Sequence, residues 1–341
     1  MRERFGMYPR FSHCSTLCKT AVTGGVALLL AACAGETPTG VPGSSDAAST
    51  PTALSMTPGA AKTAASATNR LMRVLPTVQM MSESRRGATA SGSATNSPWD
   101  LTYFGGPVVT TATSWDVYVN CTTSPAGCWG TGSLTPATFL RDLNQSDLIR
   151  VASQYLDENA EGRFAVSELS LNTTFTNNTA QQSDIFDVLA SAVTATKATG
   201  YTNIYHVFLP KGTDMCIDAT HCYSPNNPST FTFCAFHGAV DFVVSATETL
   251  HVLYTVEPYQ AVSACLLPTE TRVIDATASA LSHEFFETIT DPDLDAWFNA
   301  LTGNEVGDLC FGFRFSDEVG RRSYVVQEEY SNDIHDCTNK G

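Results

Sequence analysis

From about residue 99 onward, short apolar runs rich in valine and aromatic residues alternate with stretches of helical periodicity. The apolar runs predict strands over 115–119, 203–209, 231–236, 240–244, 250–256 and 324–328. Helical patterns predict helices over 136–143, 146–155, 183–200 and 272–290. Thr135 and Pro136 are N-terminal signals of the first helix, and Ser183 and Gly200 mark the ends of the third. Since helices and strands follow no regular alternation, the pattern predicts an α+β fold rather than a doubly wound sheet.

The helix predicted over 272–290 has two different sides. Its apolar stripe, which should face the core, consists of Ile274, Ala278, Leu281, Phe285 and Ile289. His283, Glu284 and Glu287 cluster on another side, with Asp291 one turn further along. This polar cluster indicates either a site that binds something or an ordinary solvated face.

The first 33 residues have the pattern of an export signal. A basic stretch precedes an apolar run over 26–32, which is shorter than the about 20 residues needed to span a bilayer. The run ends in small residues followed by Cys33, as in a bacterial lipobox, so Cys33 is the predicted lipidation site. An ordinary cleaved signal is the alternative. Because Ala34 rather than aspartate follows, we expect an anchor in the outer membrane or at the cell surface.

Residues 34–98 are dominated by Ala, Ser, Thr, Gly and Pro. Such a segment buries too little apolar surface to offset its chain entropy, so it is predicted to be a disordered tether. The stretch 70–81 is more apolar, and we expect it to dock on the domain or to form a short amphipathic piece broken by Pro76. Residues 99–341 then form a single domain.

The balance of charges argues against one class of partner. The signal holds four of the 19 Lys and Arg and one of the 34 acidic residues, so the chain after it has a net charge of −18. Nucleic acids and anionic surfaces need clusters of Lys and Arg, so neither is an expected partner. Contact with a membrane is expected only through the lipid anchor. The acidity keeps an exported protein soluble, and it also favours divalent cations.

The cysteines predict disulfide bonds. Of the 11 cysteines, three precede residue 34 and eight lie in the predicted domain. An even number in an exported domain is typical of disulfides, because that compartment is oxidising. We predict a local bond between Cys121 and Cys128 and a C-terminal bond between Cys310 and Cys337. Zinc held by thiolates is disfavoured, since no C-x-x-C pair occurs.

The polar cluster is a near match to the zinc-protease pattern H-E-x-x-H, with glutamate in place of the second histidine. This pattern predicts His283 and Glu287 as ligands of a divalent metal, with zinc expected, and Glu284 as the general base. The third ligand is sought among Asp308, Glu305 and His237. A capping role for Asp308 and a structural role for His237 remain alternatives. A carboxylate ligand lowers the Lewis acidity of the metal, so a weak or purely structural site is also consistent.

Two other kinds of site deserve comparison. Asp291, Asp293 and Asp295 are spaced to supply some ligands of a calcium ion, but they lack a full calcium-loop pattern. A binding module for glycans would instead show exposed aromatic residues along a groove. The candidates for that role are Trp99, Trp115, Trp129 and Trp297.

Several short motifs in order resemble the EXORDIUM, or phosphate-induced protein 1, family over about residues 102–339. They are Gly105–Val109, Val207–Leu209, Cys216, Cys234 to His237, Ser282–Glu284 with Glu287, Asp291–Pro292, Ala296–Phe298, Glu305–Cys310, Val325–Gln327 and Cys337. The resemblance implies an extracellular protein, in a family without a settled biochemical activity. It also implies that His237, His283, Glu284, Glu287, Glu305 and Asp308 belong to one recurring pattern, and it adds Cys216 and Cys234 as disulfide candidates. Asp293 falls on no family position.

The sequence therefore favours an exported lipoprotein with a zincin-like, metal-dependent site for amide hydrolysis. The expected substrate is a peptide or a cell-wall polymer. The competing hypothesis is a surface module without enzymatic activity that binds a cell-wall glycan or a partner protein.

Overall fold

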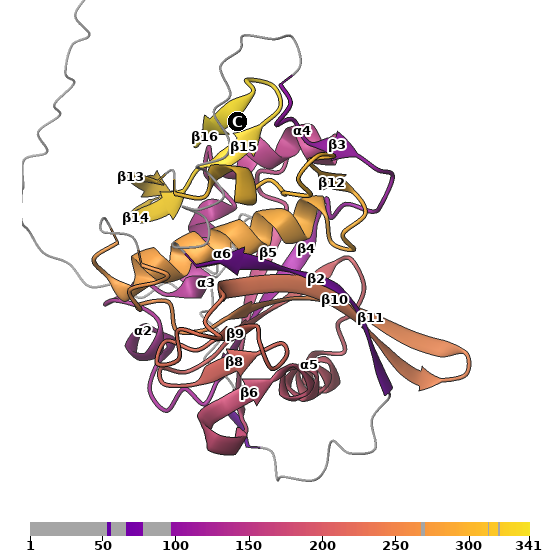
Figure 1. Cartoon of the computed structure of the whole chain (residues 1–341), viewed down its shortest axis with the longest axis vertical. Helices are drawn as coiled ribbons and strands as arrows, with labels where there is room; N and C mark the ends of the chain where they lie inside the picture. The colour runs from indigo at the N-terminus through magenta and orange to yellow at the C-terminus, as the bar shows by residue number, and fades with distance from the viewer. Residues whose placement is uncertain (1–52, 56–65, 78–96, 267–269, 313, 320) are drawn as a thin grey trace, which may run out of the picture. The chain divides into compact units, whose positions relative to one another are not determined.

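A mixed sheet of seven strands organises the chain, in the order β1-β5-β4-β7-β11-β10-β2 (Figure 1). The computed structural model describes residues 53–55, 66–77, 97–266, 270–312, 314–319 and 321–341. The strands are β1 (Ala53–Ser55), β2 (Ser66–Pro76), β4 (Ala112–Val119), β5 (Phe164–Asn172), β7 (Asn203–Phe208), β10 (Phe233–Ser245) and β11 (Glu248–Glu257). The strands from β1 to β11 pair in parallel, whereas β10 pairs antiparallel with both β11 and β2. This architecture confirms the predicted α+β fold.

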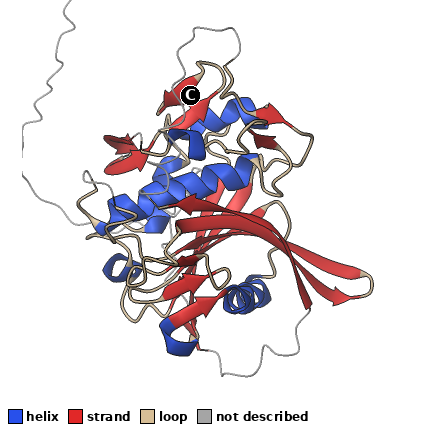
Figure 2. Cartoon of the chain, in the orientation of Figure 1, coloured by secondary structure: helices blue, strands red, loops and turns tan. Residues whose placement is uncertain are grey.

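Helices cover both faces of the sheet (Figure 2). Helices α3 (Pro136–Leu143), α4 (Ser153–Leu156) and α6 (Val273–Thr290) share one apolar cluster, together with the 3₁₀ helix η1 (Ile149–Ala152). Helix α5 (Gln182–Thr196) packs on the opposite face, in a second cluster. Strand β4 contributes side chains to both clusters. Tyr118 belongs to the first cluster, and Val117 and Val119 point to the other face and belong to the second.

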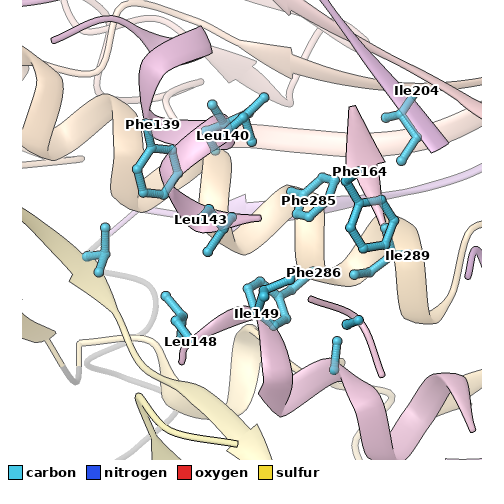
Figure 3. Close-up of a cluster of buried hydrophobic side chains, with 14 of the residues drawn as sticks. Phe139, Leu140, Leu143, Leu148, Ile149, Phe164, Ile204, Phe285, Phe286 and Ile289 are labelled. Carbon is cyan, nitrogen blue, oxygen red and sulfur yellow. The ribbon is translucent and has the colours of Figure 1, made fainter. Parts of the chain in front are cut away.

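Helix α6 lies inside the molecule and has no solvated side. Every residue from Ile274 to Thr290 is buried. Its apolar stripe meets α3 and the sheet as predicted, with the rings of Phe164 and Phe285 edge to face at 5.1 Å (Figure 3). Its other sides contact β10, β11 and strand β14 (Arg322–Gln327). The polar cluster of this helix is therefore interior, which rules out the solvated-face alternative.

Small elements surround this core. They are the pairs β3 (Thr102–Tyr103) with β12 (Trp297–Phe298), β13 (Arg314–Val319) with β14, and β15 (Glu329–Ser331) with β16 (Asp336–Thr338), the three-stranded β6 (Thr179–Gln181), β8 (Asp214–Cys216) and β9 (Cys222–Tyr223), and the helices α2 (Pro125–Cys128), η2 (Thr176–Asn178) and η3 (Asp308–Cys310). Segment 299–312, which contains η3, lies against α6. Its Gly307 is in close contact with the ring of His283 on that helix.

Most predicted elements are present, and the differences have local causes. Helix α3 begins after a capping box on Thr135, as its sequence predicts. The strands predicted over 231–236 and 240–244 form one continuous strand, since Gly238 is accommodated inside β10. Helix α5 begins after Gln181 rather than at Ser183 and ends at Lys197, which adopts the left-handed conformation before Gly200 is reached. The predicted helix over 146–155 is shorter, as η1 and α4.

The prediction of a disordered tether over 34–98 is wrong for residues 66–77, and the docking on the domain expected of the stretch 70–81 is confirmed over 70–77. Strand β2 pairs with β10 along most of its length and forms one edge of the sheet. Leu75 is buried there against Ala235 and Ala280, which offsets the chain entropy that the polar composition alone could not. Residues 53–55 form the opposite edge as β1. Apart from Ser97 and Pro98, the rest of the tether lies outside the described residues, as do the lipobox and Cys33.

Four disulfides link the eight cysteines of the domain. The predicted bonds Cys121–Cys128 and Cys310–Cys337 are present. The other two are Cys216–Cys222 and Cys234–Cys265. Among the helices within the described ranges, none is long and apolar enough to cross a bilayer.

Candidate metal centre

Six side chains that the sequence singled out converge beside helix α6. His237 comes from β10, and Glu305 and Asp308 come from the segment that leads into η3. His283, Glu284 and Glu287 come from α6 itself. Five of the six form two groups of three that could each hold a metal ion, with Glu287 common to both, and the sixth, Glu305, lies beside His237.

The first group, which we call the strand set, consists of His237, Glu284 and Glu287. Nδ1 of His237 lies 3.1 Å from Oε2 of Glu284 and 3.3 Å from Oε2 of Glu287. Ligands bound at about 2.1 Å in tetrahedral geometry are about 3.4 Å apart, so these separations suit a single small cation. All three residues are buried.

The second group, which we call the helix set, consists of His283, Glu287 and Asp308. Nε2 of His283 lies 3.0 Å from Oε1 of Glu287 and 3.8 Å from Oδ1 of Asp308. The backbone N–H of Asp308 donates to Oε1 of Glu287 at 3.2 Å, and Oδ2 of Asp308 accepts from the N–H of Glu305 at 3.1 Å. The side chain of Asp308 is 14% exposed, so this group lies nearer to solvent than the strand set.

The surroundings of His237 match those of a metal ligand. A ligating histidine usually presents its other ring nitrogen to a carboxylate, which fixes its orientation. Nε2 of His237 lies 3.6 Å from Oε1 of Glu305, and Oε2 of Glu305 pairs with Nε of Arg73 at 3.0 Å. Arg73 also donates to the carbonyl of Gly303. Arg73 on β2 therefore anchors the carboxylate behind His237.

The surroundings of His283 are different. Nε2 of Gln327 donates to the carbonyl of Gly307 at 2.7 Å and lies 3.1 Å from Nδ1 of His283. With the amide so oriented, Nδ1 of a neutral His283 accepts, and the imidazole proton sits on Nε2 facing Glu287. A Cβ atom on Gly307 would lie 2.6 Å from Nδ1, so glycine is needed for this close approach. In this arrangement His283 holds the carboxylate of Glu287 in place.

Several atoms of the centre make no hydrogen bond within the part of the chain that the structure describes. They are Nε2 of His237 and of His283, Oε1 of Glu284, and both carboxylate oxygens of Glu305. Glu305 is compensated by its ion pair with Arg73, but Oε1 of Glu284 has no such contact among the ion pairs described. Buried polar atoms are nearly always satisfied, and a cation on the helix set would satisfy Nε2 of His283, which faces Glu287 and Asp308.

The charges of the centre also favour a bound cation. Burial acts to lower the pKa of His237, but the charge of Glu305 and the hydrogen bonds that His237 donates to Glu284 and Glu287 outweigh it and raise this pKa well above its ordinary value. For His283, burial is likewise outweighed by Glu287, and the pKa rises to about 10. Burial and the charge of Glu287 raise the pKa of Asp308 to about 7. Without a cation, the carboxylates thus keep protons on both imidazoles.

Sequence reasoning assigned no role to two residues that organise this centre, although Gln327 lies in the motif Val325–Gln327 of the family resemblance. Arg73 lies in the segment 70–81, the more apolar part of the predicted tether, and the presence of two arginines there, Arg70 and Arg73, was the available signal. Gln327 ends the apolar run of β14. A polar residue directly after two buried valines indicates a side chain that makes a specific hydrogen bond in the interior. Neither residue could be connected to His237 or His283 without knowing how the strands pair.

The other candidates lie elsewhere. Asp293 contacts His251 and Tyr201 rather than the metal centre. Asp291 accepts a hydrogen bond from the N–H of Ala296, and it forms no metal group with Asp293 and Asp295. Of the tryptophans, Trp129 is buried beside Tyr118, and Trp99, Trp115 and Trp297 are half-buried, so none is an exposed platform.

No protein-family model matches the chain, and no curated protein or solved structure is significantly similar to it. The resemblance to the EXORDIUM family stays a prediction. The six residues that it groups into one pattern do lie together in space.

Proposed function

We propose that the protein is an exported, metal-dependent hydrolase that holds a divalent cation on the strand set. The observation that carries this proposal is the support behind two of the three ligands. Glu305 backs His237, and His283 holds the second oxygen of Glu287. The donor set of one imidazole and two carboxylates suits zinc and also the harder ion Mn²⁺. Such an ion supplies Lewis acidity for hydrolysis of an amide bond in a peptide or cell-wall polymer.

The residues around the cation have separate tasks. Asp308 is placed to accept the proton of the attacking water, because its carboxylate is the most exposed of the group and stands beside Glu287. The proton then passes to the leaving amine, so that one water molecule is consumed for each bond broken. Glu284 serves as a ligand here, in contrast to the general base expected from the H-E-x-x-E pattern.

Export and lipidation at Cys33 belong to the same proposal. Four disulfides favour an oxidising compartment, since such bonds are rare where thiols are kept reduced. Mass analysis of the protein from membranes of a bacterial host would show a lipid on Cys33. A mature chain that begins after residue 33 without a lipid would contradict the anchor.

Three near-isosteric variants separate the roles of the acidic residues. Asp308→Asn should keep one tightly bound cation and lose at least about 100-fold of the hydrolytic rate, as expected for a general base. Glu284→Gln should lower the binding affinity for the cation by about 10–100-fold. Asp293→Asn, outside the centre, is the matched control and should change neither property. Cation content by mass spectrometry and cleavage of a peptide pool provide the two measurements.

Two other outcomes would change the role of Glu284 or exclude the proposed function. A Glu284→Gln variant that keeps its cation but loses hydrolysis would return Glu284 to the role of general base. A wild-type protein that binds no divalent cation would exclude the hydrolase and leave the buried cluster as architecture.

A second candidate function rests on a different surface. Tyr103 is 49% and Phe104 is 50% exposed on the ribbon of β3 and β12, where Phe104 stacks on Phe298. Beside this ribbon is a cavity of about 360 Å³, lined by residues that include Thr102, Asn299 and Leu301. Exposed rings next to a polar cavity suit the stacking of sugar rings. Binding of a cell-wall glycan that Phe104→Ala abolishes and Glu284→Gln leaves intact would favour this function.

A further inference from the structure

The carboxylate of Glu287 belongs to both metal groups through different oxygens. Oε2 faces His237 in the strand set, and Oε1 faces His283 in the helix set. A carboxylate that presents one oxygen to each of two donor groups has the geometry of a bridge between two cations. Bridged pairs of this kind have ions about 3.5–4 Å apart.

We propose that the helix set binds a second divalent cation, bridged to the first by Glu287. The inference deepens the proposed function and rests on its first cation site. Nε2 of His283, Oε1 of Glu287 and Oδ1 of Asp308 are the ligands, with separations of 3.0 and 3.8 Å from the imidazole nitrogen. Nε2 of His283 is buried and points at the other two donors.

The balance of charge supports two ions. The centre buries the carboxylates of Glu284, Glu287 and Glu305 and most of that of Asp308. Arg73 is the cation paired with them, through Glu305. With the four carboxylates ionised, Arg73, two neutral imidazoles and one divalent ion therefore leave a net charge of −1 in a region of low dielectric, which attracts a second cation.

The second cation binds more weakly than the first because of Gln327. A cation on Nε2 of His283 requires the imidazole proton on Nδ1, where the amide nitrogen of Gln327 now lies at 3.1 Å. The amide must turn to present its oxygen, and it then loses its hydrogen bond to the carbonyl of Gly307. Nothing comparable opposes His237, whose second nitrogen already faces a carboxylate. We expect a difference of at least about 10-fold in affinity.

The second site controls the first one. Asp308 is the most exposed residue of the centre, so ions exchange from this side. A cation on Asp308 occupies the carboxylate that the proposed hydrolysis uses as its base. Hydrolysis should therefore rise as the first ion binds and fall as the second one does.

The experiment is a titration of the cation-free full chain with Mn²⁺ alone, followed by calorimetry and by electron paramagnetic resonance. Two ions per chain are expected, in two phases of unequal affinity, with a spin-coupled spectrum in the second phase. Asp308→Asn and His283→Gln should each keep the first phase and lose or weaken the second by at least about 10-fold. His237→Gln should weaken the first phase. Circular dichroism shows whether each variant is folded.

The outcomes separate this inference from the proposed function. A single ion per chain at saturating Mn²⁺, with hydrolysis present, would overturn the second site and leave the hydrolase intact. Two ions with no spin coupling, or a second phase that survives both Asp308→Asn and His283→Gln, would place the second ion elsewhere. Two coupled ions without hydrolysis of any substrate would establish the two-cation centre and remove the hydrolase.

Discussion

At the scale of single residues, His206 shows how the sheet handles an interior titratable group. It is fully buried on β7, where its two ring nitrogens lie 3.0 Å from the hydroxyl of Thr255 and 3.1 Å from that of Ser114. Burial lowers its pKa to about 3, because desolvation disfavours the charged imidazolium. The folded protein therefore keeps this imidazole neutral at pH values where the unfolded chain would protonate it.

This difference predicts a pH dependence of stability. Between its ordinary pKa of 6.5 and about 3, the unfolded state binds a proton at His206 that the folded state does not. Stability is therefore lost as pH falls through this window. From pH 7 to pH 4.5, wild type should lose about 2–3 kcal/mol more than His206→Gln. Urea unfolding of both proteins at the two pH values, with a chelator present, measures the difference. Equal losses would show that His206 is protonated in the folded state.

At the scale of elements, strand β2 joins the sheet from far upstream in the chain. It covers the edge of β10, contributes the buried Leu75, and carries Arg73 to Glu305. Without it, β10 would present an unpaired apolar edge, which promotes aggregation.

A truncated chain that begins at Trp99 should therefore fold poorly. Removal of β2 takes away the burial of Leu75 and the packing of Met72 and Val74, each worth about 1.5–3 kcal/mol at full burial. We expect the free energy of unfolding to fall by at least about 3 kcal/mol. We also expect a tendency to aggregate and a lower affinity for the first cation. Urea midpoints, size-exclusion profiles and Mn²⁺ affinity should be compared with those of a chain that begins at residue 64. Matching values for the two chains would mean that β2 is dispensable.

What the sequence could predict depended on how local each feature is. The apolar stripe of α6 and the Thr135 cap of α3 are encoded within a few residues, so both were correctly predicted. The burial of the polar side of α6 depends on β10, β14 and segment 299–312, which periodicity within the helix does not reveal. Strand β5 was missed, because its mixture of serine, glutamate and valine reflects only partial burial. The ligand residues were found through their spacing, and their grouping required the fold.

At the scale of the whole molecule, disulfides link the ends of several segments that position the centre. Cys310 closes η3 two residues after Asp308 and is bonded to Cys337 in β16, across 27 residues of sequence. A bond that closes a longer loop removes more entropy from the unfolded chain.

The two predicted disulfides should therefore differ in their effect. Replacing Cys310 and Cys337 by serine should cost about 3–4 kcal/mol, and replacing Cys121 and Cys128 about 2 kcal/mol, from loop lengths of 27 and 7 residues. The first double variant should also weaken cation binding at Asp308, whereas the second should not. Urea unfolding without reductant and Mn²⁺ titration provide the measurements. A larger loss from the short loop would contradict the loop-entropy argument.

The residues of the centre are far apart in the sequence, and this separation determines when the centre can assemble during folding. Arg73, His237, His283, Asp308 and Gln327 all have to be present before the ligands are complete and supported. A chain that emerges with its N-terminus first cannot assemble this centre until nearly all of it has appeared, and contacts of such long range form slowly. Under the proposed function, the ion bound would be set by whichever cations are abundant where folding finishes, since donor groups of this kind discriminate weakly by affinity alone. The timing of folding would then decide which metal the protein binds.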